Sequence, residues 1–176
     1  LLGLRPQDEV WAKRDAGSTT GTDLSGEAVG AFLAGRAIIA AAAADGRELT
    51  TEEMVELGAH RDVAVLAWEK AVGASIIHYI NAVIGFGDEL EASAATYDFY
   101  AHAKEWSEMK GFALALQFNP RSPVTDANFV ILHQKLGDRP EFDTADLAAY
   151  ETALLEARTL LETAYGFDPA KRPKAG

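Results

Sequence analysis

Apolar residues recur along this chain at intervals of three and four, the spacing that places side chains on one side of an α-helix. The pattern predicts five helices, three of them long, over residues 25–45, 50–84, 89–118, 125–136 and 143–165. No stretch alternates apolar and polar residues as a half-buried strand would. The fold class we predict is therefore all-α: a bundle of about five helices that follows an irregular N-terminal segment.

Residues that start and stop helices stand at the ends of these segments. A hydroxyl at Thr50 or Thr51, followed by Glu52 and Glu53, is typical of a helix start. The hydroxyl caps free backbone N–H groups, and the acids face the positive end of the helix dipole. Gly85, which opens a Gly-x-Gly stretch, predicts the end of the second helix.

These elements divide the chain into three parts. Residues 1–24 are rich in Gly, Thr, Ser and Asp and lack sustained periodicity, which predicts an irregular segment. Residues 25–167 form the predicted helical bundle domain, and residues 168–176 a flexible tail. A length of 176 residues suits one domain that buries a core without disulfides or metals.

The apolar sides of the helices follow from the turn of about 100° between successive residues. They consist of Val29, Phe32, Arg36, Ile39 and Ala43 in the first helix, Val65, Glu69, Val72, Ile76, Ile80 and Val83 in the second, and Leu147, Tyr150, Leu154, Arg158, Leu161 and Tyr165 in the last. Three charged residues therefore stand on sides that we predict to be buried.

The charged residues in question are Arg36, Glu69 and Arg158, and each is costly to bury without a partner. We interpret Glu69 as the partner of Arg36 or Arg158, because a planar guanidinium suits a buried carboxylate, and expect the pair to fix the register of the helices. The alternative places Glu69 in a ligand or metal pocket. His78, on roughly the opposite side of the helix, is interpreted as a packed residue that hydrogen-bonds across a helix contact.

The third predicted helix carries a second group of polar residues. Asp98, His102 and Glu105 share one side at positions i, i+4 and i+7. An imidazole and two carboxylates can bind a divalent cation such as iron, manganese or zinc, so these three are the candidate metal ligands. The alternative is a solvated helix face, because ligands from one helix rarely suffice.

Composition limits the function further. The chain carries 27 acidic and 16 basic residues, a net charge of −11, which repels nucleic acid and attracts cations or a basic partner. It has no cysteine, which excludes thiolate nucleophiles and thiolate metal sites. The longest apolar run, residues 37–44, is too short to span a bilayer. Gly-x-Ser-x-Gly, His-Glu-x-x-His, phosphate-loop and dinucleotide motifs do not occur, so we predict no catalytic and no cofactor-binding residues.

Two longer stretches are more specific than any short motif. They read AWEKAVGASIIHYIN over residues 67–81 and HAKEWSEMKGFALALQFNPRSP over residues 102–123, and LHQKLGD, LLETAYGF and GRAII accompany them. Together they resemble the C-terminal half of a family of bacterial envelope proteins known as domain of unknown function 4856. The resemblance covers roughly residues 31–167.

The resemblance implies a periplasmic or outer-surface bacterial protein, exported or lipoprotein-like, of a kind associated with imelysin-like, iron-regulated proteins. Iron is then the most plausible metal. Members of the family are longer, and their N-terminal half carries a His/Trp/Asp/Glu-rich helix motif that has no counterpart here. We therefore expect half of a longer precursor or complex. Its partner is then another protein chain or that N-terminal half, with no nucleic acid and no membrane span.

These observations favour a non-enzymatic helical binding or assembly module of the bacterial envelope, linked to the acquisition of iron or another metal. One alternative is a metal-dependent enzyme or imelysin-like peptidase subunit. The Gly-x-His-x-x-Glu signature of imelysin-type proteins is broken, however, because Val63 stands in place of the glutamate after Gly58-Ala59-His60. The other alternative is a structural subunit of a surface assembly.

Overall fold

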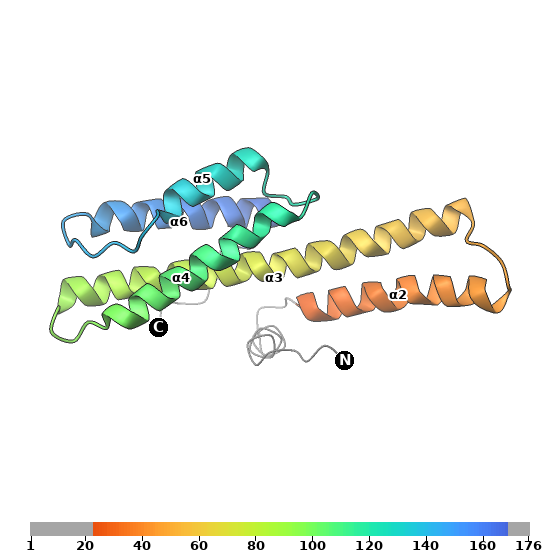
Figure 1. Cartoon of the computed structure of the whole chain (residues 1–176), viewed down its shortest axis with the longest axis horizontal. Helices are drawn as coiled ribbons and strands as arrows, with labels where there is room; N and C mark the ends of the chain where they lie inside the picture. The colour runs from red at the N-terminus through yellow and green to blue at the C-terminus, as the bar shows by residue number, and fades with distance from the viewer. Residues whose placement is uncertain (1–22, 169–176) are drawn as a thin grey trace. The chain divides into compact units, whose positions relative to one another are not determined.

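The computed structural model describes residues 23–168, and all regular structure in these residues is helical (Figure 1). The elements are α2 (Leu24–Ala44), α3 (Thr51–Ala92), α4 (Phe99–Ala115), the short 3₁₀ turn η1 (Leu116–Phe118), α5 (Asp126–Leu136) and α6 (Leu147–Tyr165). The predicted all-α fold class with five helices is confirmed. The irregular segment predicted for residues 1–24 and the tail predicted for 168–176 lie almost wholly outside the described residues.

The chain divides into two compact units whose boundary falls within α3. Unit 1 ends at Ala71 and unit 2 begins at Val72. Unit 1 therefore contains α2 and the first half of α3, and unit 2 contains the second half of α3 with α4, η1, α5 and α6. The bundle domain predicted over residues 25–167 spans both units.

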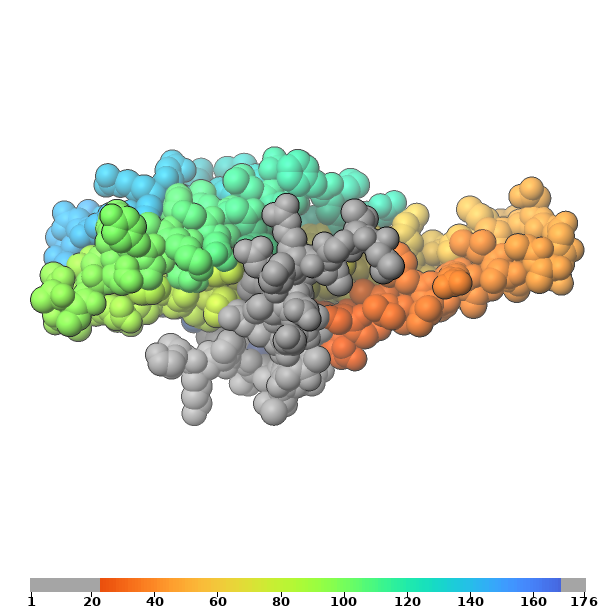
Figure 2. Space-filling model, turned by 60° about the horizontal axis from the view of Figure 1, so that its bottom comes forward, coloured from red at the N-terminus to blue at the C-terminus, as the bar shows by residue number. Residues whose placement is uncertain are grey.

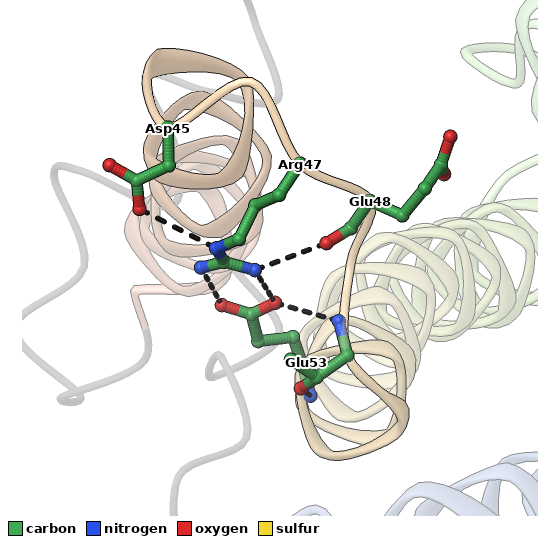
Figure 3. A network of polar contacts seen from close by, with 5 residues as sticks. Asp45, Arg47, Glu48 and Glu53 are labelled. Atoms are coloured by element: carbon green, nitrogen blue, oxygen red, sulfur yellow. Dashed lines mark hydrogen bonds and ion pairs between the residues drawn. The ribbon is translucent and has the colours of Figure 1, made fainter.

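A polar network joins α2 to α3 within unit 1 (Figure 3). Gly46 adopts the positive φ of 63° that ends α2. The Glu53 carboxylate accepts a hydrogen bond from the Thr50 N–H (2.9 Å), and the Thr50 hydroxyl accepts one from the Glu53 N–H (3.2 Å). This capping box begins α3 where the sequence predicts it. The Arg47 guanidinium donates two hydrogen bonds to the same carboxylate, at 2.7 and 2.8 Å, and lowers the pKa of Glu53 to about 2.

The two helices of unit 1 pack through small residues. The buried residues of α2 are Leu24, Ala28, Ala31, Gly35 and Ala42. A Cβ added to Gly35 would lie 3.0 Å from Leu57 Cδ1 of α3. The apolar side predicted for α2 is therefore wrong, because Arg36 is exposed and so are Val29, Phe32 and Ile39 beside it. At this contact the absence of a side chain on Gly35 leaves room for the Leu57 side chain of α3.

Unit 2 has a core of large apolar side chains drawn from all its helices. The core residues are Ile76, Ile80 and Val83 of α3, Met109 and Ala113 of α4, Leu116 of η1, Leu132 and Leu136 of α5, and Leu147, Leu154, Ala157, Leu161 and Tyr165 of α6. Tyr79 adds a ring stacked on Phe112, with centroids 5.6 Å apart. The apolar sides predicted for the second half of α3 and for α6 are confirmed.

α3 is longer than predicted. It continues through Gly85 and Gly87 to residue 92, and α4 begins only at residue 99, so the helix start predicted at residue 89 is wrong. A glycine inside a helix costs roughly 1 kcal/mol, which tertiary packing can offset. Gly87 lies against α6, where an added Cβ would be 3.6 Å from Leu147 Cδ2.

Two described helices, α2 and α3, are long and apolar enough to cross a membrane by length and composition alone. Half of the apolar window of α3 is buried in the structure, as in the core helix of a soluble protein, and such helices pass the same test. Neither helix is therefore a clear membrane span.

Candidate functional site

The first turn of α4 places an imidazole in the interior of unit 2. The Asp98 carboxylate accepts a hydrogen bond from the Ala101 N–H (3.0 Å) and so caps the helix. One turn later His102 has no exposed surface. Its ring stacks on Phe86 of α3, with centroids 5.7 Å apart and planes at 13°, and meets the ring of Phe142 at 5.4 Å and 80°. These contacts hold the imidazole in one orientation.

The two ring nitrogens of His102 have different surroundings. Nδ1 lies 2.6 Å from the Tyr97 hydroxyl, a hydrogen bond in which either group can be the donor. Nε2 is buried and has no hydrogen-bond partner among the described residues. Burial also lowers the pKa of His102, so the ring is neutral near pH 7.

A small pocket lies beside this imidazole, between α3, α4 and α6 of unit 2. Its apolar walls are Val83, Ile84, Leu147 and Leu154. Three carboxylates, those of Asp88, Glu91 and Glu151, also line it, and no Lys or Arg is among the described residues that line it. Its interior volume of about 20 Å³ suits a single water or ion. The charge of its lining favours a cation.

Tyr150 lines the same pocket and is held by a hydrogen-bond triangle that the sequence analysis missed. Its hydroxyl donates to the Leu136 carbonyl (2.9 Å), and the Trp106 Nε1–H donates to Tyr150 Oη (3.0 Å) and to the same carbonyl (3.2 Å). The triangle joins α4, the end of α5 and α6. The only feature of the sequence that indicates this triangle is a Trp and a Tyr on apolar sides of helices. The indole N–H and the phenol O–H of such residues usually find a hydrogen-bond partner when they are buried.

The three predicted metal ligands do not form a site together. Asp98 is the cap of α4, His102 is buried, and the carboxylate of Glu105 is bound by Lys104 at 2.9 Å. Among the residues that the structure describes, no three His, Asp or Glu side chains lie close enough to hold a metal ion. His102 alone is retained as a candidate ligand.

The buried charges also differ from the prediction. Glu69 is buried as predicted, whereas Arg36 is exposed and so does not lie inside a bundle. Arg158 is half-buried and donates to Asn81 Oδ1 at 2.7 Å, with its Nε 3.9 Å from the buried carboxylate of Glu162. The sequence analysis missed Glu162, although its i, i+4 spacing from Arg158 is typical of an ion pair on one helix. The partner predicted for Glu69 stays a prediction.

His78 is half-buried, and its ring meets the edge of Tyr79 with centroids 5.2 Å apart. The hydrogen bond predicted for His78 across a helix contact stays a prediction. Its neighbour Tyr79 donates a hydrogen bond from its hydroxyl to the Glu108 carboxylate of α4. Burial and this hydrogen bond raise the pKa of Tyr79, so the phenol stays protonated at neutral pH.

Unit 1 presents the second candidate surface, which we call the apolar surface of unit 1. Its exposed large side chains are Val29, Phe32, Leu33 and Ile39 of α2 and Met54, Val55, Val63, Leu66 and Trp68 of α3. Phe32 is 67% exposed and Trp68 68%. Figure 2 shows one side of these two helices, coloured red-orange to yellow. The two described helices of unit 1 therefore expose nine large apolar side chains, and large exposed apolar patches often mark interaction sites.

Comparison of the chain with protein-family models, with curated proteins and with solved structures finds no match.

Proposed function

We propose that this chain is a non-enzymatic helical binding or assembly module of the bacterial envelope, and that unit 1 docks on another protein chain through its apolar surface. The observation that supports the proposal is the placement of side chains in unit 1. Small residues occupy the contact between α2 and α3, and large apolar residues lie outside it. The location in the envelope and the link to iron or another metal rest on the family resemblance alone.

Energetics support a docking role for this surface. Covering one large apolar side chain contributes roughly 1.5–3 kcal/mol, so even a few of them supply enough free energy for a specific complex. Aromatic side chains are frequent among the residues that dominate binding, and Phe32 and Trp68 are both exposed here. The net charge of −11 favours a partner whose rim is basic.

A photo-crosslinking amino acid at position 32 tests the proposal in cells that express the full chain natively. We expect one discrete crosslinked product that contains a protein chain, either a different protein or a second copy. The matched control carries the same amino acid at exposed Thr152 of unit 2 and should give no product. Leu33→Glu should abolish crosslinking from position 32 while the far-ultraviolet circular dichroism spectrum stays unchanged.

Two outcomes would contradict the proposal. One is the absence of any crosslink from position 32, together with a monomer in light scattering of the purified chain. The other is equal crosslinking from positions 32 and 152, which would show contact without a preferred surface.

A further inference from the structure

We infer that the pocket beside His102 binds one divalent transition-metal ion, with His102 Nε2 as its nitrogen ligand and carboxylates of the pocket as its oxygen ligands. This site is carried by unit 2 and does not depend on the docking proposed for unit 1.

The first argument is the buried nitrogen. Nε2 of His102 is fully buried and has no hydrogen-bond partner among the described residues, a state that costs free energy for a polar atom. His102 is one of the residues that line the pocket. A neutral imidazole nitrogen is the commonest protein ligand of transition metals.

The second argument is the support of the ring. A metal-binding histidine usually donates its other N–H to a neighbouring oxygen, which fixes the tautomer and the orientation. Tyr97 Oη lies 2.6 Å from Nδ1 and can accept a hydrogen bond from Nδ1–H, which leaves the Nε2 lone pair for the metal. The stacked ring of Phe86 prevents rotation away from the pocket.

The third argument is the charge of the lining. Asp88 and Glu91 stand one turn apart on α3, and Glu151 lies on α6. All three side chains are exposed, and exposed side chains change rotamer readily. One nitrogen with carboxylate oxygens suits zinc, iron(II) or cobalt(II), whereas magnesium and calcium prefer oxygen ligands only.

The arrangement also limits the affinity. No three potential ligands stand together among the described residues, so at least one carboxylate must turn toward His102 when the ion binds. Ordering an exposed side chain costs conformational entropy and so weakens binding. We therefore expect micromolar affinity, with water molecules completing the coordination shell.

Isothermal titration calorimetry of the full chain with zinc and with cobalt(II) tests the site. We expect one ion per chain for each metal and no heat with magnesium. His102→Phe keeps the aromatic packing and should abolish binding. Tyr97→Phe removes the acceptor for Nδ1–H and should weaken binding by about 10-fold. The cobalt complex should show visible absorption bands that disappear in His102→Phe.

A matched control is His133→Asn, because His133 Nε2 is also buried without a hydrogen-bond partner in the described part of the chain but does not line the pocket. This variant should bind zinc as the unchanged chain does. If His102→Phe does not fold, the double substitution Asp88→Asn with Glu151→Gln, at two exposed positions, should still weaken binding at least 10-fold. No heat at micromolar zinc, or unchanged affinity in His102→Phe or in the double variant, overturns the inference.

Discussion

The two units of this chain bury different kinds of side chain, and α3 shows the difference within a single helix. Its unit 1 half buries Ala64 and Ala67, whereas its unit 2 half buries Ile76, Ile80 and Val83. A pair of helices joined through small residues packs closely but removes little apolar area from water. Several helices around large residues remove much more, and the hydrophobic effect scales with that area. Unit 2 therefore buries enough large apolar side chains to form a stable core of its own. The described helices of unit 1 leave most of their large apolar side chains exposed.

The largest expected effect comes from shortening a leucine to alanine in unit 2, compared with the same substitution in unit 1. Leu161 of α6 has no exposed surface, and Leu161→Ala should lower the free energy of unfolding by about 2–5 kcal/mol, because it leaves a cavity. Leu33 of α2 is 58% exposed, and Leu33→Ala should change it by less than about 0.5 kcal/mol. Urea unfolding followed by circular dichroism measures both. Equal losses would mean that unit 1 has a covered apolar core after all.

A pair of glycines in α3 gives an intermediate effect and tests how tightly unit 2 is packed. A Cβ at Gly73 would lie 2.6 Å from Cε2 of Tyr165, whose ring is buried. Gly73→Ala should therefore destabilise by about 1–3 kcal/mol, in spite of alanine's better helix propensity. Gly85 has no heavy atom within 4 Å of such a Cβ, and Gly85→Ala should stabilise by about 0.5–1 kcal/mol. Thermal unfolding of both variants measures the difference, and a stabilised Gly73→Ala would contradict the close contact.

The smallest expected effect is the response to pH. Burial, with the nearby Lys110 charge, lowers the pKa of His133 in unit 2 below its ordinary value of 6.5. As the pH falls through 6.5, the unfolded chain takes up a proton that the folded chain does not, so the free energy of unfolding should decrease; above 6.5 this effect is absent. His133→Asn should flatten the decrease between pH 6.5 and 5 in urea titrations. An unchanged slope would show that His133 does not carry it.

Unit 1 provides the contrast for this titration. Its network depends on Glu53, whose pKa is lowered to about 2 chiefly by the Arg47 hydrogen bonds. The stabilisation from this carboxylate is present above the ordinary pKa of 4.5 and is lost as the pH falls toward 2. Hydrogen exchange at the Thr50 amide, which donates to Glu53, should therefore stay constant between pH 6.5 and 5 once corrected for the intrinsic rate.

Local patterns were enough to predict some elements, and tertiary contacts changed others. Thr50 and Glu53 lie three residues apart, so their capping box follows from the chain itself. Gly85 carries the local signal of a helix end, yet α3 passes through it, because packing in unit 2 outweighs a cost of about 1 kcal/mol. The candidate site divides in the same way. His102 was predicted as a ligand, but only the packing of the helices stacks the ring of Phe86 on it and brings Asp88 and Glu151 into the lining of the same pocket.

The sequence by itself determined the helical class, the capping box that begins α3, and the apolar sides of α6 and of the second half of α3, because these depend on residues within a few positions of one another. Only the tertiary structure decided which side of α2 is buried and which nitrogen of His102 is left without a partner. The physical reason is that periodicity shows where apolar residues lie on a helix, while the closeness of two backbones decides which of them are covered. Gly35 and its small neighbours permit that close approach, and Phe32 does not.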